Sequence, residues 1–244
     1  MKLKLTLVMM VRSIAFWVLA AGTLPYFCIQ ALLLALLPPK IRHRIMIVTA
    51  GYYFCWLLRH VAGVKYTVSG LENIPKGPGI LAGNHQSAWE TMALNRFLPS
   101  CIWIMKKEIF KIPFYGWGVR AMSTIAIDRS RGEDALSQVI TQGKQRFMHG
   151  FWIIMFPEGT RVKPKSRKPF KHGCAKMAQR MQVPIVPFAH NAGYCLPKNS
   201  FWFYPGSVTV VIGKPLYPQE GEDASALTKR LESWVYTQLD QMGS

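Results

Sequence analysis

The chain has few acidic residues and no paired cysteines, and both shortages limit what it can be. Of its 244 residues, 12 are Asp or Glu and 30 are Lys or Arg, which gives a formal net charge of +18. The five cysteines include no Cys-x-x-Cys pair, which argues against a zinc ribbon, a thioredoxin-type redox site and a disulfide scaffold. Because half of the residues are hydrophobic, the chain is not disordered, and its length suits one domain or one domain with an appendage.

The N-terminal quarter has no acidic side chain at all. No carboxylate precedes Glu72, whereas residues 1–71 carry eight Lys or Arg. Residues 13–37 contain no charged side chain, and these 25 residues are long enough to span a bilayer as a helix. Pro25 lies near the middle of this run and is expected to break or kink such a helix. A second uncharged run, residues 45–58, is too short for an ordinary span.

Two arrangements of this segment remain open: either the first run crosses a membrane and the second lies at its interface, or both form a helical pair embedded in one leaflet. Both runs are rich in Trp, Tyr and Phe, which favour the water–lipid boundary, and their basic flanks attract anionic lipid. A cleaved signal peptide and a buried helical hairpin of a soluble protein are weaker alternatives. Since no zinc-finger or RNP-type pattern accompanies the basic charge, nucleic acid is not expected as a partner. The sequence therefore predicts a membrane-binding helical segment at residues 1–63 and a separate domain at residues 64–244.

Beyond Gly63, short apolar strands alternate with segments of helix length. Strands are expected at residues 64–68, 80–82, 102–105, 124–127, 151–156, 183–188 and 208–212, and helices at residues 89–97, 132–148, 172–181 and 224–239. This alternation indicates an α/β fold with a mixed, mostly parallel sheet flanked by helices. In such a fold, the loops that follow the strands carry the chemistry.

A histidine and a carboxylate, His85 and Glu90, follow the strand expected at residues 80–82. On one regular helix, five residues turn about 500°, so the two side chains would lie roughly 140° apart and would not meet. They can meet if His85 lies in the loop and Glu90 in the first turn of the next helix. One imidazole nitrogen would then bind the carboxylate, and the other could take a proton, as in a catalytic triad without its nucleophile. An ordinary polar loop with a capping residue is the structural alternative.

The segment Phe-Pro-Glu-Gly-Thr-Arg, at residues 156–161, follows another apolar strand. Gly159 permits close backbone approach or an unusual φ, and Arg161 offers a planar fork that suits a phosphate. Residues 161–180 carry eight basic side chains and no acidic one, so an anionic ligand or lipid headgroups would be attracted there. A solvated basic loop is the alternative.

Together these motifs resemble the glycerolipid acyltransferase family, and most closely its 1-acyl-sn-glycerol-3-phosphate acyltransferases. Four blocks match in order, and they are Asn84-His85 with Glu90, residues 106–129, residues 156–161 and residues 183–187. The resemblance covers residues 64–215, and the hydrophobic N-terminus is similar to the family's membrane-binding segment. Position 90 departs from the family pattern, because it is Glu where the family usually has Asp.

The resemblance implies transfer of a fatty acyl group from acyl-CoA or acyl carrier protein to the sn-2 hydroxyl of 1-acyl-sn-glycerol-3-phosphate. The product would be phosphatidic acid, made in phospholipid biosynthesis at a membrane, with the bacterial cytoplasmic membrane as the default. His85 would be the general base and Glu90 the carboxylate that orients it. The residues that the resemblance assigns to substrate binding are Arg161, Lys106, Arg129, Glu158, Gly159, Thr160 and Asn84. No metal and no cofactor is expected.

Other functions remain possible for the same residues. An acyltransferase for a different lysolipid would share every motif, and a noncatalytic membrane protein that binds lipid would make His85 and Glu90 incidental. A thioesterase or lipase would need a nucleophile, and the sequence has no Gly-x-Ser-x-Gly elbow. Ser87 and Cys174 lie beside histidines, but nothing marks either as activated. The other histidines, His190 among them, show no ligand spacing and are expected to be ordinary.

Overall fold

The computed structural model describes residues 6–113, 115–128 and 133–243 of the chain. Within these ranges a sheet of seven strands has the order β1-β7-β6-β2-β5-β3-β4. The strands are β1 (Val64–Ser69), β2 (Ile80–Gly83), β3 (Cys101–Lys106), β4 (Ile125–Ile127), β5 (Trp152–Met155), β6 (Ile185–His190) and β7 (Gly206–Ile212). Neighbouring strands are parallel except for β6 and β7, which pair antiparallel. The predicted mixed, mostly parallel α/β sheet is confirmed.

The helices of this domain are α4 (Trp89–Ala93), α5 (Tyr115–Ala121), α6 (Glu133–Met148), α7 (Gly173–Met181) and α8 (Ala224–Gln241). The four expected helices are all present. The first of them is shorter than predicted, because α4 ends at Ala93 and a 3-10 turn, Leu94–Arg96, follows it. The helix α5 was not expected from the sequence.

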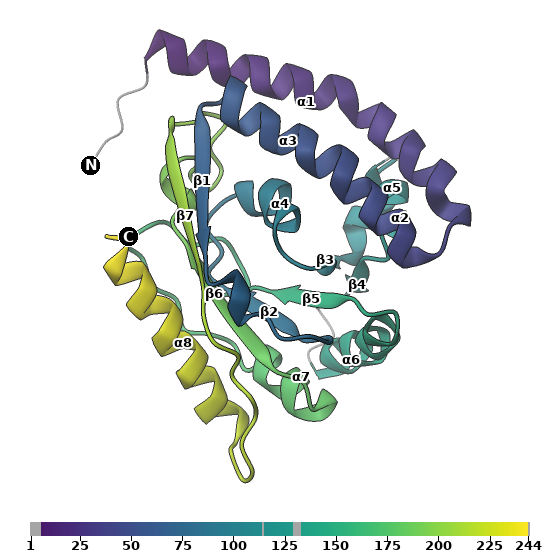
Figure 1. Cartoon of the computed structure of the whole chain (residues 1–244), viewed down its shortest axis with the longest axis vertical. Helices are drawn as coiled ribbons and strands as arrows, with labels where there is room; N and C mark the ends of the chain where they lie inside the picture. Colours follow the sequence, from purple (N-terminus) through teal and green to yellow (C-terminus); the bar gives the residue numbers. More distant parts are fainter. Residues whose placement is uncertain (1–5, 114, 129–132, 244) are drawn as a thin grey trace.

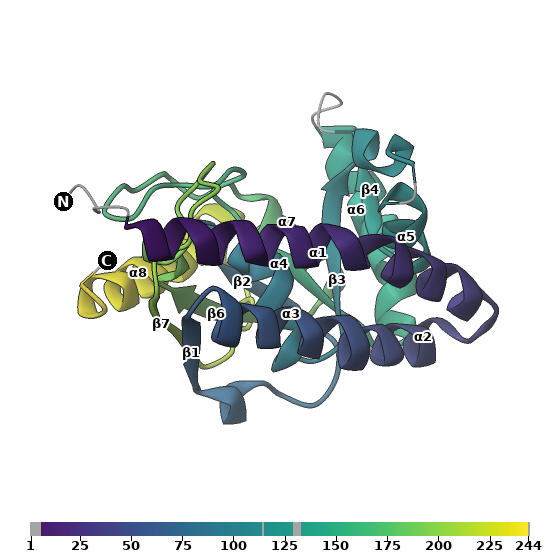
Figure 2. The same cartoon turned by 90° about the horizontal axis from the view of Figure 1, so that it is seen from above.

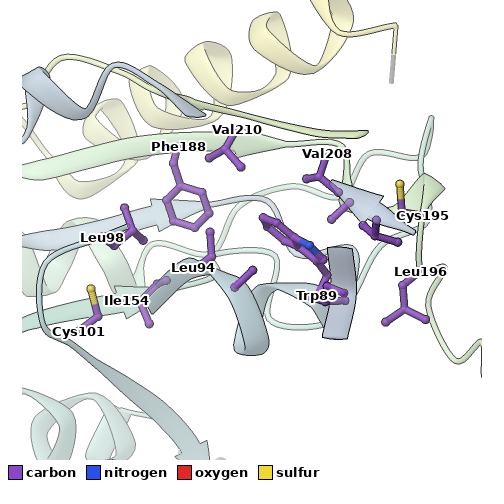
Figure 3. Packing of buried hydrophobic residues seen from close by; sticks show 14 of the residues in the cluster. Trp89, Leu94, Leu98, Cys101, Ile154, Phe188, Cys195, Leu196, Val208 and Val210 are labelled. Atoms are coloured by element: carbon purple, nitrogen blue, oxygen red, sulfur yellow. The ribbon is translucent and has the colours of Figure 1, made fainter. Parts of the chain in front are cut away.

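Each strand sends alternate side chains into two cores, one on either face of the sheet. On β2, Leu81 belongs to the core under α1 and α4, whereas Ile80 and Ala82 belong to the core under α6, α7 and α8. Figure 1 shows these two groups of helices on opposite sides of the sheet. In the first core, Trp89 is fully buried beside Phe188, Leu94, Val208 and Val210 (Figure 3). The loop between β2 and α4 is therefore held by packing against the sheet.

The N-terminal residues form two long helical stretches that lie side by side across the domain (Figures 1 and 2). The first is α1 (Leu7–Leu33), which continues through Pro25, so of the two effects expected there, a break or a kink, the break does not occur. The second runs through α2 (Pro39–Met46), a π-helical turn (Ile47–Gly51), α3 (Tyr52–Trp56) and a second π-helical turn (Leu57–Val61). By length and composition, Leu7–Leu36 is the one helix among the described residues that could cross a membrane.

One side of α1 is attached to the α/β domain. The Phe16 ring is fully buried, with its centroid 4.5 Å from that of Phe203, and the Ser13 hydroxyl accepts a hydrogen bond from the Phe203 N–H at 2.9 Å. The Trp17 indole N–H donates to the Phe201 carbonyl at 2.8 Å. The opposite side of the helix presents large apolar side chains, including Leu7, Val11, Val18 and Leu33, to its surroundings. The helix thus packs on the domain and keeps an uncovered apolar surface.

Candidate active site

The loop that carries His85 is fixed where β2 meets β6. A Cβ on Gly83 would lie 2.3 Å from the Phe188 carbonyl oxygen, so only glycine allows this approach of the two strands. The buried Asn84 amide donates to the His190 carbonyl at 2.8 Å and accepts the His190 N–H at 3.0 Å. These two bonds show that the Asn84 side chain supports the loop by joining it to the end of β6.

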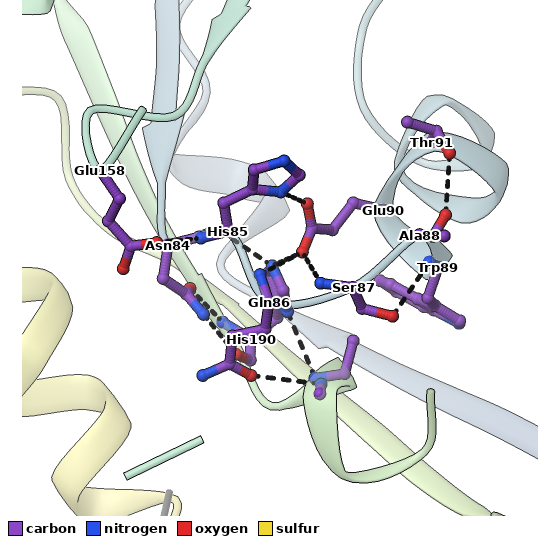
Figure 4. Close-up of polar contacts among 12 residues, drawn as sticks. Asn84, His85, Gln86, Ser87, Ala88, Trp89, Glu90, Thr91, Glu158 and His190 are labelled. Carbon is purple, nitrogen blue, oxygen red and sulfur yellow. Dashed lines mark hydrogen bonds and ion pairs between the residues drawn. The ribbon is translucent and has the colours of Figure 1, made fainter. Parts of the chain in front are cut away.

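His85 and Glu90 meet as the sequence predicted, with His85 in the loop and Glu90 in the first turn of α4 (Figure 4). The His85 Nδ1 binds the Glu90 Oε2, and the Glu90 Oε1 accepts the N–H groups of Gln86 and Ser87, each at 2.7 Å. The His85 ring stacks on Phe156 with the ring centroids 4.2 Å apart. Its side chain is 19% exposed, and in the described part of the chain its Nε2 has no hydrogen-bond partner. That nitrogen is available to a substrate.

The surroundings of Glu90 keep its carboxylate ionised. Burial by itself would raise the pKa of Glu90, but the attraction and hydrogen bond of His190, together with those of His85, outweigh it and hold the pKa well below its usual value. An ionised Glu90 is a hydrogen-bond acceptor only. It therefore places the imidazole proton of His85 on Nδ1 and leaves a lone pair on Nε2.

His190 is a member of this site that the sequence did not reveal. Its ring is fully buried, with Nε2 3.2 Å from the Glu90 Oε1 and 3.0 Å from the Asn84 carbonyl oxygen. His190 is the last residue of β6, which pairs with β2 so that Phe188 lies opposite Gly83. The available signal was its position just after the strand expected at residues 183–188, at the edge of the sheet where such loops gather.

Glu158, from the loop after β5, closes the other side of His85. Its Oε2 accepts the His85 backbone N–H at 2.9 Å, and its side chain is nearly completely buried. Burial raises the pKa of Glu158 to about 8, although the bond from the His85 N–H acts in the opposite direction. Glu158 is consequently protonated near neutral pH and adds little negative charge to the site.

The following residues form the basic side of the site. Gly159 has φ +70°, and a Cβ placed on it would lie 3.5 Å from the Lys171 Nζ, so Lys171 lies over this turn. Arg161 is half-buried, and the described residues offer it no hydrogen bond or ion pair; Thr160 is exposed beside it. Lys171 was counted in the sequence only as part of a basic stretch, because nothing local connects it with Gly159.

The residues of the second block lie on and after β3. Lys106 is exposed at the end of β3, which is the neighbour of β5 in the sheet. The adjacent Lys107 forms an ion pair with Asp128, Nζ to Oδ2, at 2.5 Å. Arg129, the other basic residue expected to bind substrate, lies outside the described residues.

The candidate nucleophiles have structural roles. The Ser87 hydroxyl is buried, donates to the Leu196 carbonyl at 2.8 Å and accepts the Trp89 N–H at 3.1 Å, so it holds the loop in place. Burial raises the pKa of the Cys174 thiol to about 12, which keeps it protonated and unreactive. Over the ranges that the structure describes, no group of three or more His, Cys, Asp or Glu is placed to hold a metal ion.

A histidine whose Nδ1 binds a carboxylate and whose Nε2 is free has the arrangement that could take a proton from a hydroxyl group. The chain belongs to the acyltransferase family, whose model matches residues 65–191, and it is an acyltransferase. This finding confirms the family resemblance predicted from the four sequence blocks.

Named relatives support the same family. The chain is 37% identical over 233 residues to the 1-acyl-sn-glycerol-3-phosphate acyltransferase of Pseudomonas aeruginosa, covering 92% of this chain and 89% of that protein. It is 30% identical over 188 residues to the human 1-acyl-sn-glycerol-3-phosphate acyltransferase alpha, covering 74% and 65% of the two chains. The crystal structure of the 1-acyl-sn-glycerophosphate (LPA) acyltransferase PlsC from Thermotoga maritima has the same fold, with a TM-score of 0.81, 24% identity and coverage of 97% and 96%.

Proposed function

We propose that this acyltransferase transfers a fatty acyl group from a thioester to the sn-2 hydroxyl of 1-acyl-sn-glycerol-3-phosphate, which gives phosphatidic acid. The observation that carries the proposal is the His85–Glu90 pair with its free Nε2, in a chain with relatives of this named activity. The His85 carbonyl accepts the Val162 N–H at 2.6 Å, which joins this loop to the loop that bears Arg161. The donor would be acyl-CoA or acyl carrier protein.

In this mechanism the His85 Nε2 takes the proton of the substrate hydroxyl as the oxygen attacks the thioester carbonyl. The new C–O ester bond forms, the C–S bond breaks, and the departing thiolate receives the proton from His85. Glu90 stabilises the imidazolium formed between these steps. General-base assistance of this kind contributes roughly 10²–10⁴-fold to a rate. No acyl-enzyme is needed, because the acceptor supplies the nucleophile, and the proposal includes no metal and no cofactor.

The acceptor's phosphate would bind to Arg161, with Lys171 over Gly159 and Lys106 on β3 as further cations. Arg129 is included among these phosphate-binding cations only because of the family resemblance. A protonated Glu158 at the base of the loop does not repel the phosphate dianion, which an ionised carboxylate in that place would do. Its raised pKa is therefore compatible with binding of an anionic acceptor.

The same proposal places the protein at a membrane, where both lipid substrates reside. The uncovered side of α1, with Leu7, Val11, Val18 and Leu33, and the exposed Val48 and Trp56 of the second helical stretch would enter the lipid. We propose that the protein is located at the bacterial cytoplasmic membrane, with the active site on the cytoplasmic side. Nucleic acid is not a partner in this proposal.

The test is acyl transfer by purified protein in detergent, with radiolabelled 1-acyl-glycerol-3-phosphate and palmitoyl-CoA. Labelled phosphatidic acid is expected from the wild type and from the control variant His149→Gln, which changes an exposed histidine. The rate of acyl transfer by His85→Ala should be at least a hundredfold lower. Near-normal turnover by a folded His85→Ala variant would overturn the general-base role. Absence of product with either donor and with every lysolipid tried would favour a noncatalytic lipid-binding protein.

A further inference from the structure

The Glu90 carboxylate lies between two histidines, and the proposed chemistry so far uses only one. Its Oε2 binds His85, whereas its Oε1 receives the N–H groups of Gln86 and Ser87 and faces the His190 Nε2 at 3.2 Å (Figure 4). A buried carboxylate oxygen with these three donors is fixed in position, and its partner oxygen is fixed with it.

The hydrogen bonds of His190 determine where its own proton is. The Ala192 N–H donates to the His190 Nδ1 at 3.3 Å, so Nδ1 carries a lone pair and the neutral ring has its proton on Nε2. That Nε2–H points between the Asn84 carbonyl oxygen, 3.0 Å away, and the Glu90 Oε1. Both are acceptors, which agrees with this tautomer.

The ring of His190 has little freedom to move. It is fully buried, its centroid lies 6.1 Å from those of Phe188 and Trp89, and its backbone is held by the Asn84 amide. Glu90 reaches this ring from α4 with a side chain that is one methylene longer than Asp, or about 1.5 Å. The length of Glu at position 90 is thus suited to a carboxylate that must touch both His85 and His190.

We infer that His190 is a positioning residue for acyl transfer, whose Nε2–H holds the Glu90 Oε1 so that Oε2 faces the His85 Nδ1. This inference rests on the proposed function of the His85–Glu90 pair. His190 touches no substrate in this scheme, and it acts on the reaction only through Glu90.

Loss of the His190 donor has a predictable electrostatic effect. The carboxylate charge of Glu90 would be less well stabilised, so the His85–Glu90 pair would hold its proton more tightly and titrate at higher pH. Among the described residues, a further titratable group contacts the loop of this pair. Glu158 approaches from the loop after β5, and the nearest ring neighbours, Trp89 and Phe156, do not titrate.

The experiment compares His190→Phe, which keeps a ring but no N–H, with His190→Gln, whose amide nitrogen can take the place of Nε2. His190→Asn provides a second variant without a donor at Nε2, and His149→Gln is the exposed control. The readouts are the pH dependence of kcat/KM for acyl transfer and the NMR titration of His85 in protein with labelled histidine. The NMR titration requires no turnover, so it decides the inference even if the proposed reaction is wrong.

For His190→Phe and His190→Asn we expect kcat to fall about tenfold, since a hydrogen bond to a charged group is lost, with KM unchanged. The acid limb of the rate profile and the His85 titration should move up by about half to one pH unit. His190→Gln should restore both. Unchanged His85 titration in a folded Phe or Asn variant would overturn the inference, and so would a Gln variant that resembles Phe rather than the wild type.

Discussion

Replacement of Glu158 by Gln should change how the stability of the protein depends on pH. The pKa of Glu158 is raised from 4.5 to about 8, mainly by burial. Between these two values the folded protein binds a proton that the unfolded chain does not, so the free energy of unfolding falls as pH rises through this window. At 1.36 kcal/mol per pH unit, the free energy of unfolding falls by at most about 5 kcal/mol over this interval. About 3 kcal/mol of this loss has occurred by pH 7.

Gln at this position keeps an oxygen that can accept the His85 N–H, now 2.9 Å from the Glu158 Oε2, but it cannot titrate. Between pH 5 and pH 8.5, the free energy of unfolding of Glu158→Gln should therefore rise by several kcal/mol relative to that of the wild type. Denaturant unfolding of detergent-solubilised protein, followed by tryptophan fluorescence, measures this difference, and Glu72→Gln at an exposed site is the control. A difference between wild type and Glu158→Gln that stays constant over this pH range would refute the assignment of a protonated buried carboxyl.

Three further changes probe separate parts of the structure. Arg161→Ala should raise KM for 1-acyl-glycerol-3-phosphate by about 10–100-fold and leave KM for acyl-CoA unchanged, as steady-state kinetics would show; an effect on acyl-CoA alone would contradict the phosphate assignment. Ser87→Ala should retain turnover within about tenfold but lose about 1–3 kcal/mol of stability, because the Leu196 carbonyl loses its donor. Phe16→Ala should cost about 3–5 kcal/mol in denaturant unfolding, since it empties a site against Phe203 in the core; a loss below about 1 kcal/mol would mean that α1 is not held there.

The strands were predictable because short apolar runs that are bounded by turn residues and too short for a helix usually form buried strands. The helix α5, Tyr115–Ala121, was not predicted, since two of its residues, Gly116 and Gly118, disfavour a helix. Tertiary packing accounts for one of these glycines. A Cβ on Gly116 would lie 2.4 Å from the Phe110 carbonyl oxygen, so glycine is required there, whereas one on Gly118 would lie at an ordinary contact distance, 3.7 Å, from the Cys28 Sγ on α1. Close approach of the Phe110 backbone thus explains why Gly116 is present in spite of its poor helix propensity.

The second N-terminal helical stretch is longer than the uncharged run that marks it in the sequence. The second uncharged run covers residues 45–58, but the helical stretch extends from Pro39 to Val61 and includes basic residues near both ends. Long basic side chains can extend their charged heads away from an apolar surface, so a helix need not end where charge begins. Pro25 removes one backbone donor from α1, yet the helix continues because its other turns keep their bonds.

Spacing along the chain predicts contacts in the active site only where its members are close in sequence, and Glu158 was expected there only because of the family resemblance. His85 and Glu90 were paired correctly because a loop followed by a first helical turn brings residues at that spacing together. Glu158 and His190 reach the same place only because β5 and β6 are the two neighbours of β2 in the sheet. The sequence predicts these strands but not their order, so it cannot say which loops meet.

The order of the three strands gives each of these residues its chemical role. With β2 in the centre, the loop that bears His85 is bound on one side by Glu158, through the His85 N–H, and on the other by His190, through the Asn84 side chain. Glu90 accepts enough hydrogen bonds to remain ionised in spite of its burial. The hydrogen bond to Glu158 only partly offsets the effect of burial on its pKa, so Glu158 remains protonated. The proposed reaction uses both states, because the Glu90 anion would orient the base and the neutral Glu158 would not repel the acceptor's phosphate. The electrostatic difference between two glutamates therefore follows from which strands are neighbours, and not from the residue types alone.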